Sequence, residues 1–460
     1  MMVTKRIAGV LLTVCLIAAP RTICAQEQKP AGQENAAGGP VVTLREAINT
    51  ALSNNKVIAG ARERYLRSRA QVRERRAAGL PQLGAQAQQL WTGPVPTFTV
   101  GPPGAEQTVS IGSPKTTTGA VTLSQILDLN RRVSLATGIS ELGSRIQNLN
   151  LARTEQQVIF DVQNAYYNVL RAQAKLDVAE SSVNTALERL RVTRAHFEVG
   201  TLPKFDVTRA EVDVANDQQT LISATSAVDQ RKAVLRNAMG TDPTAPIEVE
   251  QVTVPAQPLD VKIEQGVATA IERRPEVAAA EANVLLGRKS VSFARGERIP
   301  ALSANAGYNY NGEATAFRPD KFTWIVTVNA SLPIFEGGAI KARVDEAKSD
   351  VGAAQAALDQ AKLDVGLDVK SAVLNVNESY QRVQTAAQNV AQAEEALRLA
   401  QVRYEAGISL QVEVSDAETA LTQARTNMVS ATYDYATALA SYRRATATQP
   451  EFETAVVGEK

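Results

Sequence analysis

The same order of helix, strand and turn signals occurs twice along this chain. Residues 165–169 (Ala-Tyr-Tyr-Asn-Val) correspond to 372–376 (Ala-Val-Leu-Asn-Val), and the turn at 197–200 (Phe-Glu-Val-Gly) corresponds to 404–407 (Tyr-Glu-Ala-Gly). Self-similarity on this scale indicates a structural duplication. Chance similarity between alanine-rich helices is the alternative, but the proline and glycine positions align as well. The fold must therefore accommodate two related halves.

The two halves and their flanking segments divide the chain. We predict a first structural repeat at 41–240 and a second at 259–446, joined by a proline-rich linker at 241–258. Residues 26–40 and 447–460 have the composition of flexible ends.

Residues 1–25 have the layout of a secretory signal peptide. Lys5 and Arg6 precede an apolar run at 7–19, and a small-residue cleavage site ends at Ala25. The run is shorter than the roughly 20 residues that a spanning helix needs; an uncleaved anchor is the alternative. We therefore expect the protein to be exported.

The two cysteines, Cys15 and Cys24, both lie in the predicted signal peptide. Cleavage after Ala25 leaves no disulfide and no thiol chemistry. A lipidated Cys24 is the alternative, although Ile23 stands where a small residue is expected. The formal net charge of the whole chain is only +1, so there is no basic excess for binding nucleic acid.

Two long segments without proline dominate the halves, at 131–199 and 338–406. At about 1.5 Å per residue, each would form a helix on the order of 100 Å long. A glycine follows each segment (Gly200 and Gly407), and a shorter helix then returns. In the first half, Thr43 begins a capping box that opens the short helices before the strands.

Apolar residues recur at every seventh position of both long segments. This spacing keeps one narrow seam against a partner helix and imposes a left-handed supercoil. A wall of helices around a water-filled lumen has this character, and so does an ordinary two-stranded rod. The positions are Val162, Val169, Leu176, Val183, Leu190 and Phe197, and Val369, Val376, Val383, Val390, Leu397 and Tyr404.

Apolar and polar residues alternate along 302–310 and 322–332, with fainter counterparts at 83–91 and 118–125. Alternation over about 9–11 residues is the pattern of a membrane β-strand. A soluble, half-buried hairpin has the same period and is the alternative. Four aromatic residues gather at one end of the pair 302–310 and 322–332, where an interfacial belt is expected: Tyr308, Tyr310, Phe322 and Trp324.

Four strands per chain are too few for a closed membrane barrel, which begins at about eight strands. An open sheet edge in lipid leaves backbone polar groups unsatisfied. If these strands enter a membrane, the chain must oligomerise. The loops at 92–117 and 311–321 would then face the outside of the cell.

These features together resemble the TolC-like outer-membrane efflux protein family, over nearly the whole chain that follows the predicted signal. The residues that carry the resemblance are the duplicated Ala-Leu/Ile openings at 51–52 and 270–271, the Leu-Pro-Ile-Phe-Glu-Gly-Gly run at 332–338, and the turns at 197–200 and 404–407. No single motif is specific, but their order and duplication are.

The resemblance implies a mainly α fold with a membrane β-barrel. A homotrimer would form a twelve-stranded barrel, four strands per chain, continued by a periplasmic α-helical barrel. Most of the chain would lie in the periplasm of a Gram-negative-type bacterium, with the strands in outer-membrane lipid. The implied function is an outer-membrane channel of a tripartite efflux or secretion system. It would passively conduct substrates from an inner-membrane pump and a periplasmic adaptor protein to the exterior.

The resemblance also assigns site residues. Gly200 and Gly407 match the helix–turn–helix tips that dock an adaptor; ordinary hairpin turns are the alternative. Glu413 and Asp416 match carboxylates near the closing end of the tunnel, where three copies would form an acidic ring. A solvated helix face is the alternative for this pair.

Tyr404 and Asp206 match a tyrosine and a carboxylate that hold the family's periplasmic gate shut. Ser409 stands where the best-known members have an arginine that strengthens this contact, so we expect a different or weaker one here. The segment 125–130 also lacks the proline and the glycine pair of 333–338, which leaves its turn geometry open.

We predict no catalytic site, metal site or cofactor. His196 is the only histidine, and it is expected to be a helix-surface residue near a tip. A periplasmic coiled-coil adaptor and a structural or adhesin rod are the alternative functions; neither requires membrane-length aromatic strands. The transported substrate cannot be inferred from these residues.

Overall fold

A computed structural model describes residues 39–110, 113–252, 255–259, 262–312 and 320–449. The predicted signal peptide at 1–25 lies outside the described residues, as does most of both predicted flexible ends. The helices are α1 (Leu44–Asn54), α2 (Lys56–Ala77), α3 (Arg132–Glu198), α4 (Lys204–Met239), α5 (Ile263–Arg273), α6 (Pro275–Arg295), α7 (Ala339–Glu405) and α8 (Gln411–Ala445), with a 3-10 turn, η1 (Gly296–Arg298). The strands are β1 (Val41–Val42), β2 (Gln82–Trp91), β3 (Thr97–Val100), β4 (Gln107–Ser110), β5 (Lys115–Leu127), β6 (Glu248–Val249), β7 (Ala301–Asn311) and β8 (Phe322–Ser331).

Side-chain caps fix where the first helices begin. At the start of α1, the Glu46 N–H donates to Thr43 Oγ1 (3.2 Å), and the Thr43 N–H donates to Glu46 Oε2 (2.9 Å). This is the predicted capping box. Asp128 caps α3 by accepting from the backbone N–H groups of Val133 and Ser134, both at 2.8 Å. A carboxylate at a helix N-terminus satisfies orphan donors and complements the helix dipole. The segment 125–130 thus starts its helix without the proline and glycines of 333–338.

The two long helices, α3 and α7, each contain 67 residues, which confirms the prediction. The centre of the heptad seam is fully buried, since Val162, Val169, Val369 and Val376 are each 0% exposed. The seam weakens toward the turns, where Phe197 is 42% exposed. Within the described residues, none of the helices is both long enough and apolar enough to cross a bilayer.

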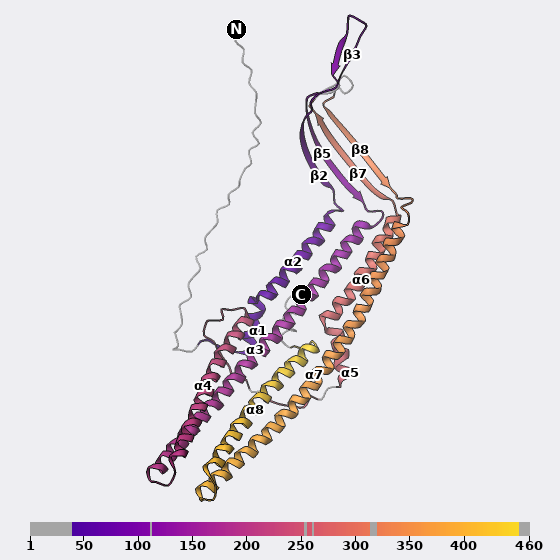
Figure 1. The fold of residues 1–460 in the computed structure, drawn as a ribbon. Coiled ribbons are helices and arrows are strands. Elements are labelled where there is room, and N and C mark those ends of the chain that lie inside the picture. Colours follow the sequence, from indigo (N-terminus) through magenta and orange to yellow (C-terminus); the bar gives the residue numbers. More distant parts are fainter. Residues whose placement is uncertain (1–38, 111–112, 253–254, 260–261, 313–319, 450–460) are drawn as a thin grey trace, which may run out of the picture. The chain divides into compact units, whose positions relative to one another are not determined.

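The four-stranded antiparallel sheet has the order β2-β5-β7-β8 (Figure 1). Residues directly opposite one another in antiparallel strands point to the same face. Tyr308 pairs with Trp324, and Ala306 pairs with both Leu123 and Val326. The register therefore gathers most of the large apolar side chains of the four strands on one face of the sheet, as the alternation predicts.

The opposite face of this sheet is polar but uncharged. Its positions are occupied mostly by amides and hydroxyls, with a few small or aliphatic residues between them. Apolar membrane-strand faces alternate with such polar faces in channel proteins. The polar side chains of this face are Gln82, Gln86, Gln88, Thr116, Thr118, Thr122, Ser124, Ser303, Asn305, Asn309, Asn311, Thr323, Thr327, Asn329 and Ser331.

The region 92–117, expected to be a loop, contains a second small sheet. β3 and β4 pair as an antiparallel hairpin, with Thr97 opposite Ser110. The sequence did not predict this pair, because each strand has only four residues and too few alternations to establish a period.

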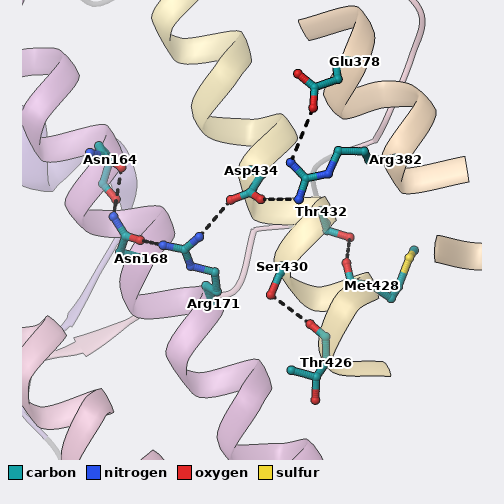
Figure 2. Close-up of polar contacts among 10 residues, drawn as sticks. All are labelled: Asn164, Asn168, Arg171, Glu378, Arg382, Thr426, Met428, Ser430, Thr432 and Asp434. Carbon is teal, nitrogen blue, oxygen red and sulfur yellow. Dashed lines mark hydrogen bonds and ion pairs between the residues drawn. The ribbon is translucent and has the colours of Figure 1, made fainter. Parts of the chain in front are cut away.

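The two halves meet where α3 contacts both α6 and α8. Asp434 on α8 accepts hydrogen bonds from Arg171 on α3 (2.9 Å) and from Arg382 on α7 (3.1 Å) (Figure 2). Asn168 also accepts a hydrogen bond from Arg171. One carboxylate thus joins helices of both halves. At the end of the described chain, Gln449 is 1% exposed, so the first residues of the predicted tail are packed.

A tyrosine from each half binds the predicted linker. The fully buried Tyr166 hydroxyl donates to the carbonyl oxygens of Glu250 (2.7 Å) and Val42 (3.2 Å), beside the parallel pair β1–β6. The Tyr435 hydroxyl donates to the Gln257 carbonyl (2.9 Å) and accepts from the Gln257 N–H (3.2 Å). Burial raises the pKa of Tyr166 to about 12, so its hydroxyl remains a donor at neutral pH.

The Tyr166→Phe variant tests this contact. The change keeps the ring but leaves the Glu250 carbonyl without its tyrosine donor, at a cost of about 1–3 kcal/mol. We expect a lower temperature for the loss of helical circular dichroism in purified protein. Tyr380→Phe is the matched control, because that hydroxyl accepts from the exposed Gln384 side chain (2.7 Å) and binds no linker carbonyl among the described residues. Equal unfolding temperatures for both variants would contradict the assignment.

Candidate functional site

Both long helices end in the same backbone turn. After α3, the Thr201 N–H donates to the His196 carbonyl at 2.9 Å, and Gly200 has a φ of +79°. The same bonds recur around Gly407, whose φ is +72°. This is the Schellman arrangement, in which a left-handed residue reverses the chain and satisfies the last carbonyls. Glycine adopts this conformation without a steric penalty, which explains both predicted tip glycines.

The tips carry large apolar side chains in water. Val199 and Phe205 flank the first turn and are 73% and 70% exposed; Ile408 and Leu410 flank the second and are both 71% exposed. Exposed apolar side chains that cluster on a surface commonly mark a site of interaction. Each tip therefore offers a contact surface beyond its glycine.

Tyr404 and Asp206 lie on the same cavity, between the two hairpins. The cavity has a volume of about 290 Å³, and Leu202 and Ser409 also line it. Burial, and secondarily the negative charge of Asp206, raises the pKa of Tyr404. The two predicted gate residues are therefore close enough to interact electrostatically. Among the described residues, the buried hydroxyl of Ser409 has no hydrogen-bond partner.

Glu413 and Asp416 lie one helical turn apart near the start of α8, and both are exposed. Glu413 forms a 3.7 Å ion pair with Arg403 at the end of α7, so part of its charge is balanced within its own hairpin. An exposed ion pair of this length contributes little to stability. The pair thus leaves carboxylate charge available at the surface.

Arg189 on α3 forms a polar contact between the hairpins that involves two carboxylates. Its guanidinium donates to Glu418 Oε2 on α8 (2.5 Å) and to Asp213 Oδ2 on α4 (2.9 Å). The Arg189 and Glu418 side chains are only 13% and 15% exposed. A guanidinium that binds two carboxylates in this way forms charge-assisted bonds with defined geometry.

The Arg189 cluster (Arg189, Asp213, Asp217 and Glu418) contains more acid than base. Burial raises the pKa of Glu418, Arg189 lowers it, and Asp213 and Asp217 raise it further. Asp217 also accepts from Ser182 (3.0 Å). When Glu418 is ionised, its carboxylate is therefore repelled by those of Asp213 and Asp217.

The sequence did not identify this cluster. Arg189 and Glu418 are 229 positions apart, and they lie on helices that contain many other charged residues. The single available signal was the position of Arg189 beside the seam residue Leu190, where a charged side chain lies close to a helix interface. No periodic pattern predicts which carboxylate it meets.

His196 lies at the first tip, where its Nδ1 is 3.1 Å from Thr201 Oγ1. Its side chain is exposed, in keeping with the expected surface role. In the part of the chain that the structure describes, no three His, Cys, Asp or Glu side chains converge as metal ligands would.

The four predicted belt aromatics gather at one end of the apolar face of the sheet. Tyr310 is opposite Phe322, and Tyr308 is opposite Trp324. The rings of Tyr308 and Phe322 stack at a centroid distance of 5.8 Å, and Tyr310 lies 5.1 Å from Phe322. Amphipathic rings grouped in this way suit the boundary between lipid and water.

Comparison with known proteins agrees with this geometry. The family model described as "Outer membrane efflux protein" matches residues 47–241 and 267–448. The outer membrane protein TolC of Escherichia coli is 25% identical over 79% of this chain and 74% of its own length. The toluene efflux pump outer membrane protein TtgC of Pseudomonas putida is 26% identical over 84% of this chain and 79% of its own length.

Solved structures share the fold. CusC aligns with a TM-score of 0.76 and 18% identity, over 91% of this chain and 98% of that chain. The Campylobacter jejuni CmeC outer membrane channel aligns with a TM-score of 0.75 and 16% identity, over 90% and 89% of the two chains. With the family match extending through both repeats, the chain belongs to the outer membrane efflux protein family and is an outer-membrane efflux channel.

Proposed function

We propose that three copies of this chain form a closed barrel in the outer membrane, continued by a helical tunnel in the periplasm. The observation that carries this proposal is the sheet, with one apolar face and two outer strands, β2 and β8, that pair on one side only. Unpaired backbone groups in lipid cost several kcal/mol each. Joining β8 of one copy to β2 of the next removes every edge.

Exposed apolar side chains on the outer helices favour the same assembly. Val212, Ile222 and Val234 on α4 are exposed, as are Leu363 and Leu367 on α7. A helix that leaves such residues in water has an unused contact face. In the trimer, α4 and α7 of neighbouring copies would cover one another.

The proposed division of the chain follows from this assembly. Residues 1–25 are a cleaved signal, and the repeats at 41–240 and 259–446 each supply two barrel strands and one helical hairpin, with 241–258 as linker. The helices lie in the periplasm. The channel acts as a passive conduit and catalyses no reaction, and the energy for transport comes from an inner-membrane pump.

The tips dock a periplasmic adaptor protein in this proposal. Support comes from the apolar side chains around Gly200 and Gly407, which would be covered by an apolar partner surface. The backbone of each tip is held by the hydrogen bonds of its Schellman turn, which limits the conformational entropy that docking would cost.

The gate lies between the hairpins. Tyr404 and Asp206 line the same cavity, and the Arg189 cluster binds α8 to α3 and α4. Opening would separate the hairpins and expose this cluster. Glu413 and Asp416, repeated three times, would form an acidic ring that favours cations.

Electron microscopy of protein purified from outer membranes in mild detergent tests the assembly. We expect threefold particles with a detergent belt at one end and a tube on the order of 100 Å long. Monomers, or particles without a belt, would refute the trimeric barrel.

Neighbouring residues of β8 provide a matched test of the barrel. Val326 lies on the apolar face and Thr327 on the polar face. Val326→Lys places a charge in lipid, which costs about 2–4 kcal/mol near the bilayer centre. We expect loss of trimer from the outer-membrane fraction, whereas Thr327→Lys leaves it near the wild-type level. Equal loss in both variants would mean that the apolar face does not meet lipid.

Arg189→Ala tests the gate. The change leaves partly buried carboxylates together without their cation, which destabilises the contact because the remaining negative charges repel one another. The hairpins should separate, so we expect larger single-channel conductance in planar bilayers. Arg191→Ala is the control, because Arg191 pairs with Glu188 on the same helix and both side chains are exposed. A conductance unchanged by Arg189→Ala would exclude the cluster from the gate.

The gate should also respond to pH. The pKa of Glu418 is raised above its ordinary value of 4.5 in the closed, folded protein. Such a carboxyl stabilises the closed state fully below its ordinary pKa, and this stabilisation is lost as the pH rises through the raised pKa. We expect conductance to increase with pH above 4.5, and Glu418→Gln to flatten that increase. Glu413→Gln, outside the cluster, should retain it; flattening by Glu413→Gln instead would assign the effect to the acidic ring.

A further inference from the structure

Every connection between the four-stranded sheet and a helix exposes a large apolar side chain. Leu80 (α2 to β2) and Leu129 (β5 to α3) are both 58% exposed, and Ile299 (η1 to β7) is 42% exposed. In the connection from β8 to α7, Ile334 and Phe335 are 94% and 87% exposed. We call these five residues the junction rim. Because the rim repeats at all four connections, it is a feature of the architecture and not of one loop.

The backbone of the largest connection is held in place. Pro333 restricts the chain at one end, and Gly337 and Gly338 have φ values of +60° and +89° at the other. Between them, Glu336 accepts from Arg343 (2.7 Å) on α7. The polar side chain of this connection thus turns toward the helix while Ile334 and Phe335 remain exposed.

Basic side chains follow the rim on its helical side. An exposed arginine or lysine lies a few residues from the rim at each connection: Arg75, Arg131, Arg298 and Lys341. Apolar residues with basic ones a few positions away on the helical side match the two layers of a phospholipid surface, acyl chains and then phosphate groups.

We infer that the junction rim inserts into the periplasmic leaflet of the outer membrane, with Arg75, Arg131, Arg298 and Lys341 on the phosphate groups. Phospholipid is the occupant because the rim extends the apolar face of the sheet: Ala330 lies on that face, and Leu332 follows two residues later, 47% exposed. The inference rests on the proposed barrel. The rim would set the depth of the barrel in the membrane at its periplasmic end, and the aromatic belt would do so at the other end.

Lipid quenching of a fluorescent label tests the rim. The Phe335→Cys variant would be labelled with bimane and reconstituted into phosphatidylethanolamine and phosphatidylglycerol vesicles. The native cysteines, Cys15 and Cys24, both lie in the predicted signal peptide. We expect the label to lose most of its fluorescence to lipids brominated near the headgroup, and little to lipids brominated near the chain end. Labels at Val326→Cys in β8 and Ile408→Cys at the tip are the controls.

The controls separate this inference from the proposed function. A quenched label at 326 with an unquenched label at 335 would overturn the rim and leave the barrel intact. Absence of quenching at both positions would overturn the barrel itself. A label at 335 shielded from lipid and from aqueous iodide would show that a second copy of the chain covers the rim, which also overturns the inference. The label at 408 should respond to iodide alone.

The basic half of the rim has its own test. Brominated phosphatidylglycerol should quench the label at 335 more than brominated phosphatidylethanolamine does. The double variant Arg131→Gln and Lys341→Gln should reduce this preference, whereas Arg191→Gln at the tip should not. Equal quenching by both lipids in the unsubstituted background would refute the contact with phosphate groups.

Discussion

The register of the four-stranded sheet determines much of what this molecule can do. Because Ala306 pairs with both Leu123 and Val326, the apolar positions of strands from both repeats fall on one face. A slip of one residue in any strand would move its apolar side chains to the polar face. In the proposed trimer, this apolar face would meet lipid, and the edge strands β2 and β8 would pair with strands of neighbouring copies.

The duplication makes the two halves similar, and a few polar contacts join them. Both repeats end their long helices in the same Schellman turn, and each supplies a tyrosine that binds the linker. Asp434 joins α3, α7 and α8 midway along the hairpins, and the Arg189 cluster joins α3, α4 and α8 close to the tips. The contact around Asp434 has a smaller imbalance of charge than the Arg189 cluster. The Arg189 cluster is therefore the contact that a change of charge would release first.

Features that repeat along the sequence could be predicted from it, but individual contacts between distant residues could not. The valines of the heptad seam and the alternation in β7 and β8 repeat often enough to specify helix, strand and buried face. Gly200 and Gly407 could be placed because a left-handed turn favours glycine. The Arg189–Glu418 bond joins residues 229 positions apart, and many carboxylates were equally plausible partners. The hairpin β3–β4 was missed because four residues contain too little alternation.

The uncharged polar face of the sheet has a consequence for transport. Inside the proposed barrel it would offer amide and hydroxyl groups that exchange hydrogen bonds with water at little net cost. Without fixed charge, that surface would neither hold counterions nor repel a solute by its sign. Anions, cations and neutral molecules would leave through the barrel on similar terms. Selection of solutes by charge would then depend on the proposed ring of Glu413 and Asp416 at the opposite end of the channel. The barrel itself would be an uncharged, hydrophilic exit.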